Sequence, residues 1–186
     1  MAYPPTSPYG CPSFSSEFQI LAAIACQVQE INVEAGGIAY PINSSSTIGL
    51  LQSIDCNICR ATEALGGSGC IGGYDGLMGF LMSIACNSRS LVEAAGGTPE
   101  GNGYIYDPFV LWEQIACNFS ALATATGEGC YGGAFDSIWN IMIAVYCCAA
   151  QVVANGFDPS ENLVLTSPGL DQVVTSPGGV NVAVSL

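Results

Sequence analysis

The sequence contains no histidine, and only two of its residues, Arg60 and Arg89, are basic. Fifteen aspartates and glutamates give it a formal net charge of −13 at pH 7. A chain with two cations cannot neutralise a run of phosphates, which argues against a nucleic-acid partner. Without histidine or lysine, most acid–base, Schiff-base, haem and histidine–metal chemistry is also absent. We therefore expect no enzyme activity, no cofactor and no nucleic-acid partner.

Charged residues are scarce as well, at 9% of the 186 residues, whereas 50% are hydrophobic. A disordered chain shows the opposite balance, so this composition predicts a packed core. The length suits one domain with a small appendage.

An internal period of about thirty residues is the strongest signal in the sequence. A cysteine falls at the ninth position of the first four copies and one position later in the fifth. A glycine closes each copy, at spacings of 30, 30, 31 and 29 residues. The five copies are Phe18–Gly37, Ile48–Gly67, Met78–Gly97, Phe109–Glu128 and Ile138–Phe157.

Each copy has the pattern of an α-helix. Apolar residues recur at steps of three and four, as at Leu21, Ile24, Val28 and Ile31. The closing glycines are typical of helix C-termini. Residues that cap free backbone N–H groups precede the copies, namely Ser15, Ser16, Thr47, Asp75, Asp107 before Pro108, and Asp136.

A longer period of about sixty residues is superimposed on the first. The linkers at 67–75 and 127–136 resemble each other and place Cys70 and Cys130 at equivalent positions. Cys11 stands 59 residues before Cys70. These three cysteines should therefore lie at one end of the molecule.

The connections of about ten residues favour antiparallel neighbours. The sequence thus predicts an all-α fold, a five-helix up-down array built from tandem repeats over residues 15–157. A proline-rich arm, residues 1–14, precedes it. Residues 158–186 form a β-rich extension with three short strands at 163–166, 172–175 and 180–184, separated by Ser-Pro-Gly turns. Such short strands need another surface, and pairing between subunits is the favoured one.

In an up-down array the ninth positions share one level, so the mid-helix cysteines should form a layer. Inverting a helix maps position nine onto position twelve, which Cys59 occupies. The layer has three interpretations: small buried hydrophobes, a disulfide framework formed in an oxidising setting, or thiolate metal ligands.

All ten cysteines are disulfide candidates, because their number is even and connectivity does not follow from sequence. They are Cys11, Cys26, Cys56, Cys59, Cys70, Cys86, Cys117, Cys130, Cys147 and Cys148. The metal alternative uses the C-x-x-C motif together with other cysteines of the same mid-helix layer. Its ligands would be Cys56, Cys59, Cys86, Cys147 and Cys148.

Two segments bear on location. Residues 1–14 lack the cationic start and apolar core of a secretory signal. Residues 137–156 are uncharged over 20 positions, long enough to span a membrane. Polar residues interrupt them and no Lys or Arg flanks them, so a bundle helix is the better interpretation and a membrane partner is not expected.

The sequence therefore predicts a non-enzymatic, self-assembling structural protein. We expect a virion surface protein or an extracellular or spore-surface filament subunit, stabilised by disulfides. Its partners are copies of itself and other virion or surface-structure proteins, contacted by the termini. The alternative is a cytosolic copper- or zinc-storage bundle that uses cysteine thiolates.

Overall fold

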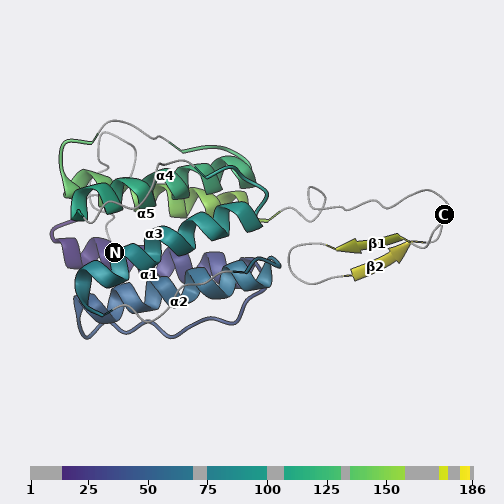
Figure 1. The fold of residues 1–186 in the computed structure, drawn as a ribbon, viewed down its shortest axis with the longest axis horizontal. Coiled ribbons are helices and arrows are strands. Elements are labelled where there is room, and N and C mark those ends of the chain that lie inside the picture. The colour runs from purple at the N-terminus through teal and green to yellow at the C-terminus, as the bar shows by residue number, and fades with distance from the viewer. Residues whose placement is uncertain are drawn as a thin grey trace.

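The computed structural model describes residues 14–68, 75–99, 107–130, 135–157, 172–175 and 181–184. Five α-helices of similar length lie in the first four of these ranges (Figure 1). They are α1 (Glu17–Glu34), α2 (Thr47–Ala64), α3 (Gly76–Ala94), α4 (Pro108–Thr126) and α5 (Ile138–Asn155). The expected helical array is thus present.

Side-chain caps start four of the helices. Ser16 Oγ accepts a hydrogen bond from Gln19 N, and Asp107 caps the first turn of α4 with Pro108 at the first helical position. The caps of α2 and α5 are Ser46 and Ser137, each one residue away from the predicted caps Thr47 and Asp136.

Pairs of glycines end the first three helices. Gly36 has a φ of 93°, which favours glycine, and its N–H donates to Val33 O. Gly37 N donates to Asn32 O at 2.9 Å. The pairs at 66–67 and 96–97 make the same bonds. The first glycine of each pair turns the chain and the second must pass close to a neighbouring helix.

That close approach shows that the helices run parallel, not up and down. A Cβ on Gly67, just after α2, would lie 2.8 Å from Ala94 Cβ at the last residue of α3. One on Gly97, just after α3, would lie 2.8 Å from Ala125 Cβ near the end of α4. Each helix therefore ends beside the end of the next one.

The same holds for the first and last pairs. A Cβ on Gly37 would lie 3.1 Å from Arg60 O in the C-terminal part of α2, and one on Gly127 would lie 3.1 Å from Asn155 Cγ at the end of α5. The predicted up-down direction is wrong. Ten extended residues reach about 33 Å, more than the roughly 27 Å of an 18-residue helix, so each connection can return the chain to the starting end.

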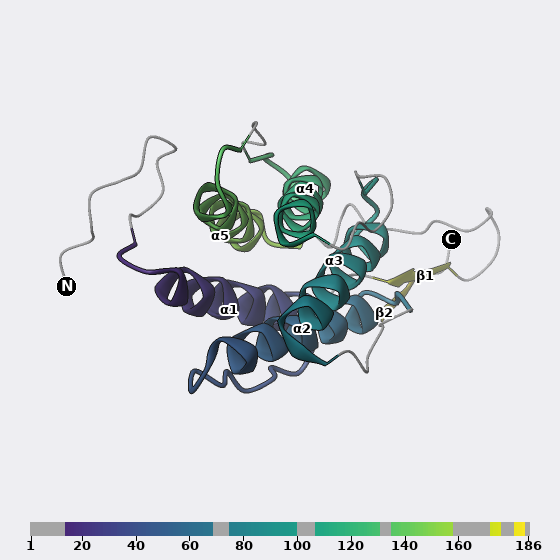
Figure 2. The ribbon, with the colours of Figure 1, turned by 60° about the vertical axis from the view of Figure 1, so that its left-hand side comes forward.

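The five helices form a closed array. Each contacts its neighbours in sequence, and α5 also contacts α1. Figure 2 shows α4 and α5 lying over α1 and α2, with α3 joining the two sides. We call the end where all five helices start the N-terminal end, and the opposite one the C-terminal end.

Side chains at regular sequence spacing in the five described helices fill the core. Two series of buried side chains, spaced 30 or 31 residues apart, point inward from successive helices, and each large member contributes about 1.5–3 kcal/mol by leaving water. The series are Leu21, Leu51, Leu81, Trp112 and Met142, and Ile24, Ile54, Ile84, Ile115 and Val145.

In the C-terminal extension, β1 (Gln172–Thr175) pairs antiparallel with β2 (Asn181–Val184), with Gln172 opposite Val184. The third expected strand, at 163–166, lies outside the described residues. So does the N-terminal arm except for Phe14, whose ring contacts that of Tyr146 on α5 edge to face at 5.2 Å.

Candidate functional site

The segment between α1 and α2 returns along α2 and is held there by polar side chains. Arg60 Nη1 donates to the carbonyl oxygens of Ile38 and Ala39, each at 3.0 Å. Asn57 Oδ1 accepts from Tyr40 N at 2.9 Å, and Asn57 Nδ2 donates to Tyr40 O at 3.1 Å. We call residues 38–46 the first return segment.

A third contact completes this attachment. Asn43 N donates to Ser53 Oγ at 2.9 Å. Ser53, Asn57 and Arg60 are separated by four and three residues, so they lie on one face of α2. This face of α2 therefore supplies hydrogen-bond partners to the backbone of the first return segment and holds it against the helix.

Asn57 also joins α2 to α1. Its Oδ1 accepts from Asn32 Nδ2 at 2.9 Å, and both side chains are fully buried. Asn32 Nδ2 donates in addition to Ile38 O. A Cβ on Gly37 would overlap Asn32 Oδ1, which explains why the second residue of this pair is glycine. The first return segment, α1 and α2 therefore meet at one polar junction.

A disulfide makes the corresponding attachment to α5. Cys130, four residues after α4 ends, bonds to Cys148 on α5, with their Cα atoms 5.3 Å apart. Cys148 continues a sequence series at spacings of 30, 31 and 30, namely Asn57, Asn87, Asn118 and Cys148. Cys130 likewise follows Tyr40 by 90 residues. The disulfide is the covalent counterpart of the Asn57–Tyr40 hydrogen bonds.

The other cysteines are dispersed over the helices. Cys26 is mostly exposed on α1, but the partial burial of its thiol, together with the nearby Glu30 carboxylate, raises the pKa of that thiol. Cys86 is buried on α3. Cys147 is also disulfide-bonded. The remaining thiols, half-buried, are Cys56, Cys59 and Cys117, and the candidates Cys11 and Cys70 lie outside the described residues.

The structure does not bring together the cysteines of the proposed metal site. Two of its five residues are in disulfides, which removes them as thiolate ligands. Within the part of the chain that the structure describes, no group of three His, Cys, Asp or Glu side chains is placed to hold a metal ion. The set concerned is Cys56, Cys59, Cys86, Cys147 and Cys148. The level assigned to Cys59 by inverting alternate helices also loses its basis, because the helices are parallel.

A buried carboxylate links α2 to α3. Asp55, 9% exposed, accepts from Ser83 Oγ at 2.7 Å and from Asn87 Nδ2 at 2.8 Å. Burial raises the pKa of Asp55, although the two hydrogen bonds favour its charged form and oppose this. The mid-helix positions of α2 and α3 are therefore level.

Amides also cross the next two interfaces. Asn118 on α4 donates to Ala85 O at 3.2 Å and to Ser88 Oγ at 3.0 Å, both on α3. Asn155 at the end of α5 donates to Ala123 O at 3.0 Å and to Glu128 O at 2.9 Å. Side-chain hydrogen bonds thus fix the register of all four consecutive helix pairs.

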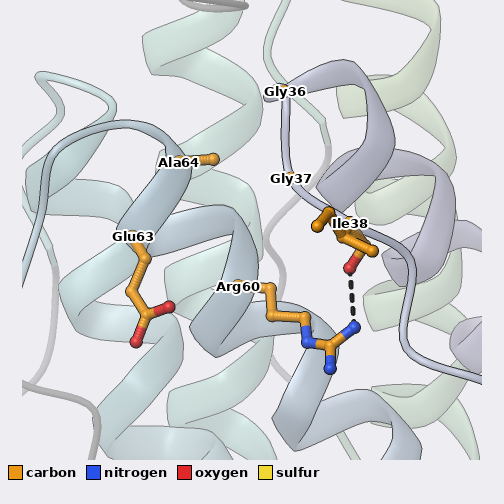
Figure 3. A pocket seen from close by; sticks show the side chains of 6 residues that line it. All are labelled: Gly36, Gly37, Ile38, Arg60, Glu63 and Ala64. Carbon is orange, nitrogen blue, oxygen red and sulfur yellow. Dashed lines mark hydrogen bonds between the residues drawn. The ribbon is translucent and has the colours of Figure 1, made fainter.

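An open pocket of about 460 Å³ lies beside the start of the first return segment. Figure 3 shows Arg60 turned toward Ile38, while Glu63 points away from it. The Arg60 guanidinium also lies 5.1 Å from the centre of the Tyr40 ring. The arginine is already engaged with backbone carbonyls, so its role is to hold the return segment. The lining residues are Gly36, Gly37, Ile38, Arg60, Glu63 and Ala64.

Sequence reasoning missed the asparagines that organise these junctions. A signal was present, because Asn follows Cys directly in three consecutive copies, at 57, 87 and 118, and Ser stands four residues before the first two. A polar residue that recurs at one position of an apolar helix indicates a buried hydrogen-bonding role. No signal marked Asp55, since the equivalent residues are Ala or Tyr.

No known protein family, curated protein sequence or solved structure matches this chain. Among the described residues, α5 is the one helix long and apolar enough to cross a membrane by length and composition. In the structure it packs between α4 and α1 as the fifth member of the array.

Proposed function

We propose that this chain is a non-enzymatic structural protein that assembles with copies of itself. Its setting is a virion surface or an extracellular or spore-surface filament, where other surface proteins can also contact it. The Cys130–Cys148 disulfide carries the proposal, because disulfides persist in oxidising surroundings. This bond fastens a connecting segment onto a rigid helical body and so suits a part that must endure outside a cell.

The period and the extensions belong to the same proposal. The five helical units are tandem repeats of one ancestral unit, so that a short repeated sequence builds the whole helical body. The C-terminal extension serves as a contact between subunits. A two-stranded ribbon such as β1–β2 is marginal alone, and its edges can pair with a further strand.

Light scattering and sedimentation of the purified full chain under non-reducing conditions test the assembly. We expect species well above the 19.1 kDa of one chain. A strictly monomeric protein across the micromolar range would reject self-assembly.

Intact mass, thiol counting and elemental analysis on the same sample test the chemistry. We expect a loss of two hydrogens for each intramolecular disulfide and no metal. Stoichiometric copper or zinc with ten titratable thiols would instead support the storage alternative.

A further inference from the structure

The sequence contains two Asn-x-Ser triplets, at residues 43–45 and 118–120. The asparagine of such a triplet is the acceptor of N-linked glycans in secreted proteins, provided that the middle residue is not proline. The first triplet lies in the first return segment, and the second lies within α4. Both triplets fit the same pattern, so the structure decides which of them can carry a glycan.

Asn43 is exposed at the N-terminal end of the array, three residues before the Ser46 cap of α2. Its backbone N–H donates to Ser53 Oγ at 2.9 Å, which fixes the loop against the helix. Among the described residues, no hydrogen bond engages Asn43 Nδ2. The nitrogen that would receive a glycan is therefore not occupied by the fold.

A glycine on α2 leaves space beside this nitrogen. A Cβ on Gly49 would lie 2.9 Å from Asn43 Nδ2 and 2.8 Å from Asn43 Cγ, too close for a real contact. Glycine lowers the stability of a helix relative to alanine, but here it keeps the side of the Asn43 amide that faces α2 free of any side chain.

The Asn43 amide is also held in a turn formed within its own triplet. Its Oδ1 accepts from Ser45 N at 3.1 Å and from Ser45 Oγ at 2.6 Å. Both bonds span two residues, so the turn depends on the triplet itself. Two donors on Oδ1 stabilise negative charge there, which eases the loss of a proton from Nδ2. The turn thus favours attack by this nitrogen.

Asn118 differs in each of these respects. It is 1% exposed, and its Nδ2 donates to Ala85 O and Ser88 Oγ on α3. Residues two apart on a helix do not face each other, and Asn118 Oδ1 has no hydrogen-bond partner among the described residues. A glycan on Asn118 would have to displace α3, so this triplet is incompatible with modification in the folded chain.

We propose that Asn43 is the acceptor of an N-linked glycan and that Asn118 is not. This inference rests on the proposed extracellular or virion-surface setting, because glycan transfer and disulfide formation share the oxidising lumen of the secretory pathway. It narrows that setting to one reached through this lumen.

The donor in this reaction is a lipid-linked oligosaccharide pyrophosphate. Asn43 Nδ2 forms a bond to C1 of the first sugar, and the bond between C1 and the pyrophosphate oxygen breaks. The lipid pyrophosphate leaves with the electron pair, and one proton of Nδ2 passes to a base of the transferase. Nothing is oxidised or reduced.

Expression of the full chain in a eukaryotic cell tests the proposal, with an added signal that directs the chain into the secretory lumen. Intact mass before and after enzymatic release of N-linked glycans shows how many the chain carries. Peptide mapping then locates the aspartate that release leaves at the acceptor position. We expect one glycan, at residue 43.

Matched substitutions separate the triplet from the loop around it. Ser44→Ala keeps the triplet and should keep the glycan, whereas Ser44→Pro should lose it. Ser45→Ala removes the hydroxyl that donates to Asn43 Oδ1 and should lose it as well. Ser120→Ala destroys the second triplet without altering Asn118 and should leave the mass of the attached glycan unchanged. Mass is measured on all lumenal protein, so a variant that folds poorly is still scored.

The failures of the two proposals are distinguishable. A lumenal chain without a glycan at residue 43, or one that keeps this glycan after Ser45→Ala, overturns the assignment of Asn43. A glycan on Asn118 of the folded, disulfide-bonded chain overturns the exclusion of the second triplet. Light scattering of the same secreted protein measures assembly separately, so a monomer that carries the glycan at Asn43 would reject self-assembly alone.

Discussion

Cys148 stands on α5 where Asn57 stands on α2, and each fastens the segment that leads into its own helix. Asn57 does so with two hydrogen bonds to Tyr40, whereas Cys148 does so with a covalent bond to Cys130. The same structural task is thus performed by two chemistries at equivalent positions of the sequence.

Loss of the disulfide should be partly offset by restoring asparagine. Cys130→Ser with Cys148→Ala removes a bond that closes a loop of 18 residues and should lower the free energy of unfolding by about 3 kcal/mol. Cys130→Ser with Cys148→Asn should recover about 1 kcal/mol through hydrogen bonds to the return segment. Urea unfolding measures both; equal stabilities would contradict the equivalence of positions 57 and 148.

Asn57→Ala should be among the most damaging substitutions on α2. It leaves the N–H and C=O of Tyr40 without their side-chain partner and removes one of the two acceptors of Asn32 Nδ2. A buried polar group that loses its partner costs about 1–3 kcal/mol, and we expect a loss of about 3 kcal/mol in thermal or urea unfolding. Gln52→Ala, exposed on the same helix, should change stability by less than about 0.5 kcal/mol. Similar effects of the two substitutions would refute the clamp.

A double-mutant cycle tests the parallel direction of the helices. Gly97→Ala should cost about 1–3 kcal/mol because the new Cβ meets Ala125 Cβ. In the background of Ala125→Gly the cost should fall by about 1 kcal/mol, since the two positions are in contact.

Ala94→Gly is the control for this cycle, because Ala94 faces Gly67 instead. The changes in free energy of unfolding caused by Ala94→Gly and by Gly97→Ala should therefore be additive. Additivity in both cycles would place the end of α3 away from the end of α4 and contradict the parallel array.

Asp55→Asn should remove one pH dependence of stability. Burial raises the pKa of Asp55 above its ordinary value of 3.8, so the folded state holds this proton more tightly than the unfolded state. The contribution of Asp55 to stability is therefore greatest at acidic pH and declines as pH rises from 3.8 through the raised folded pKa.

The measurement is the difference in free energy of unfolding between wild type and Asp55→Asn at several pH values. We expect the wild type to lose stability relative to the variant as pH increases toward neutrality. Asp55→Ala, which removes the carboxylate that accepts from Ser83 Oγ and Asn87 Nδ2 in the buried interface, should lose about 1–3 kcal/mol instead. A difference between wild type and Asp55→Asn that does not change with pH would show that Asp55 titrates normally.

The helices were predictable from sequence because their signals are local. The apolar spacing around Leu21 and Ile24 and the closing glycines identified five helices with ends within a few residues of those observed. The direction of the helices was not predictable from the same signals. Amphipathic spacing is identical for a helix pointing either way, and a ten-residue connection serves as a loop between antiparallel helices or as an extended return between parallel ones.

The site was less accessible to sequence reasoning than the fold. Cysteine drew attention through its chemistry, and of its ten candidates one bridge, Cys130–Cys148, joins two described residues. Asn57 and Asn118 also join separate parts of the structure, but through hydrogen bonds to backbone groups that are distant in the sequence. Such partners become visible only when the return segment and the neighbouring helix are placed.

Contact between α5 and α1 sets a limit on how the chain can lengthen. In an open solenoid an extra unit simply adds a turn at one edge, and related proteins vary in the number of units. Here α1 and α5 pack against each other. An additional helix could therefore be inserted only by separating this pair and enlarging the closed array. The five described helices therefore leave no free edge for a sixth, and we expect changes in chain length to be tolerated in the connecting segments instead.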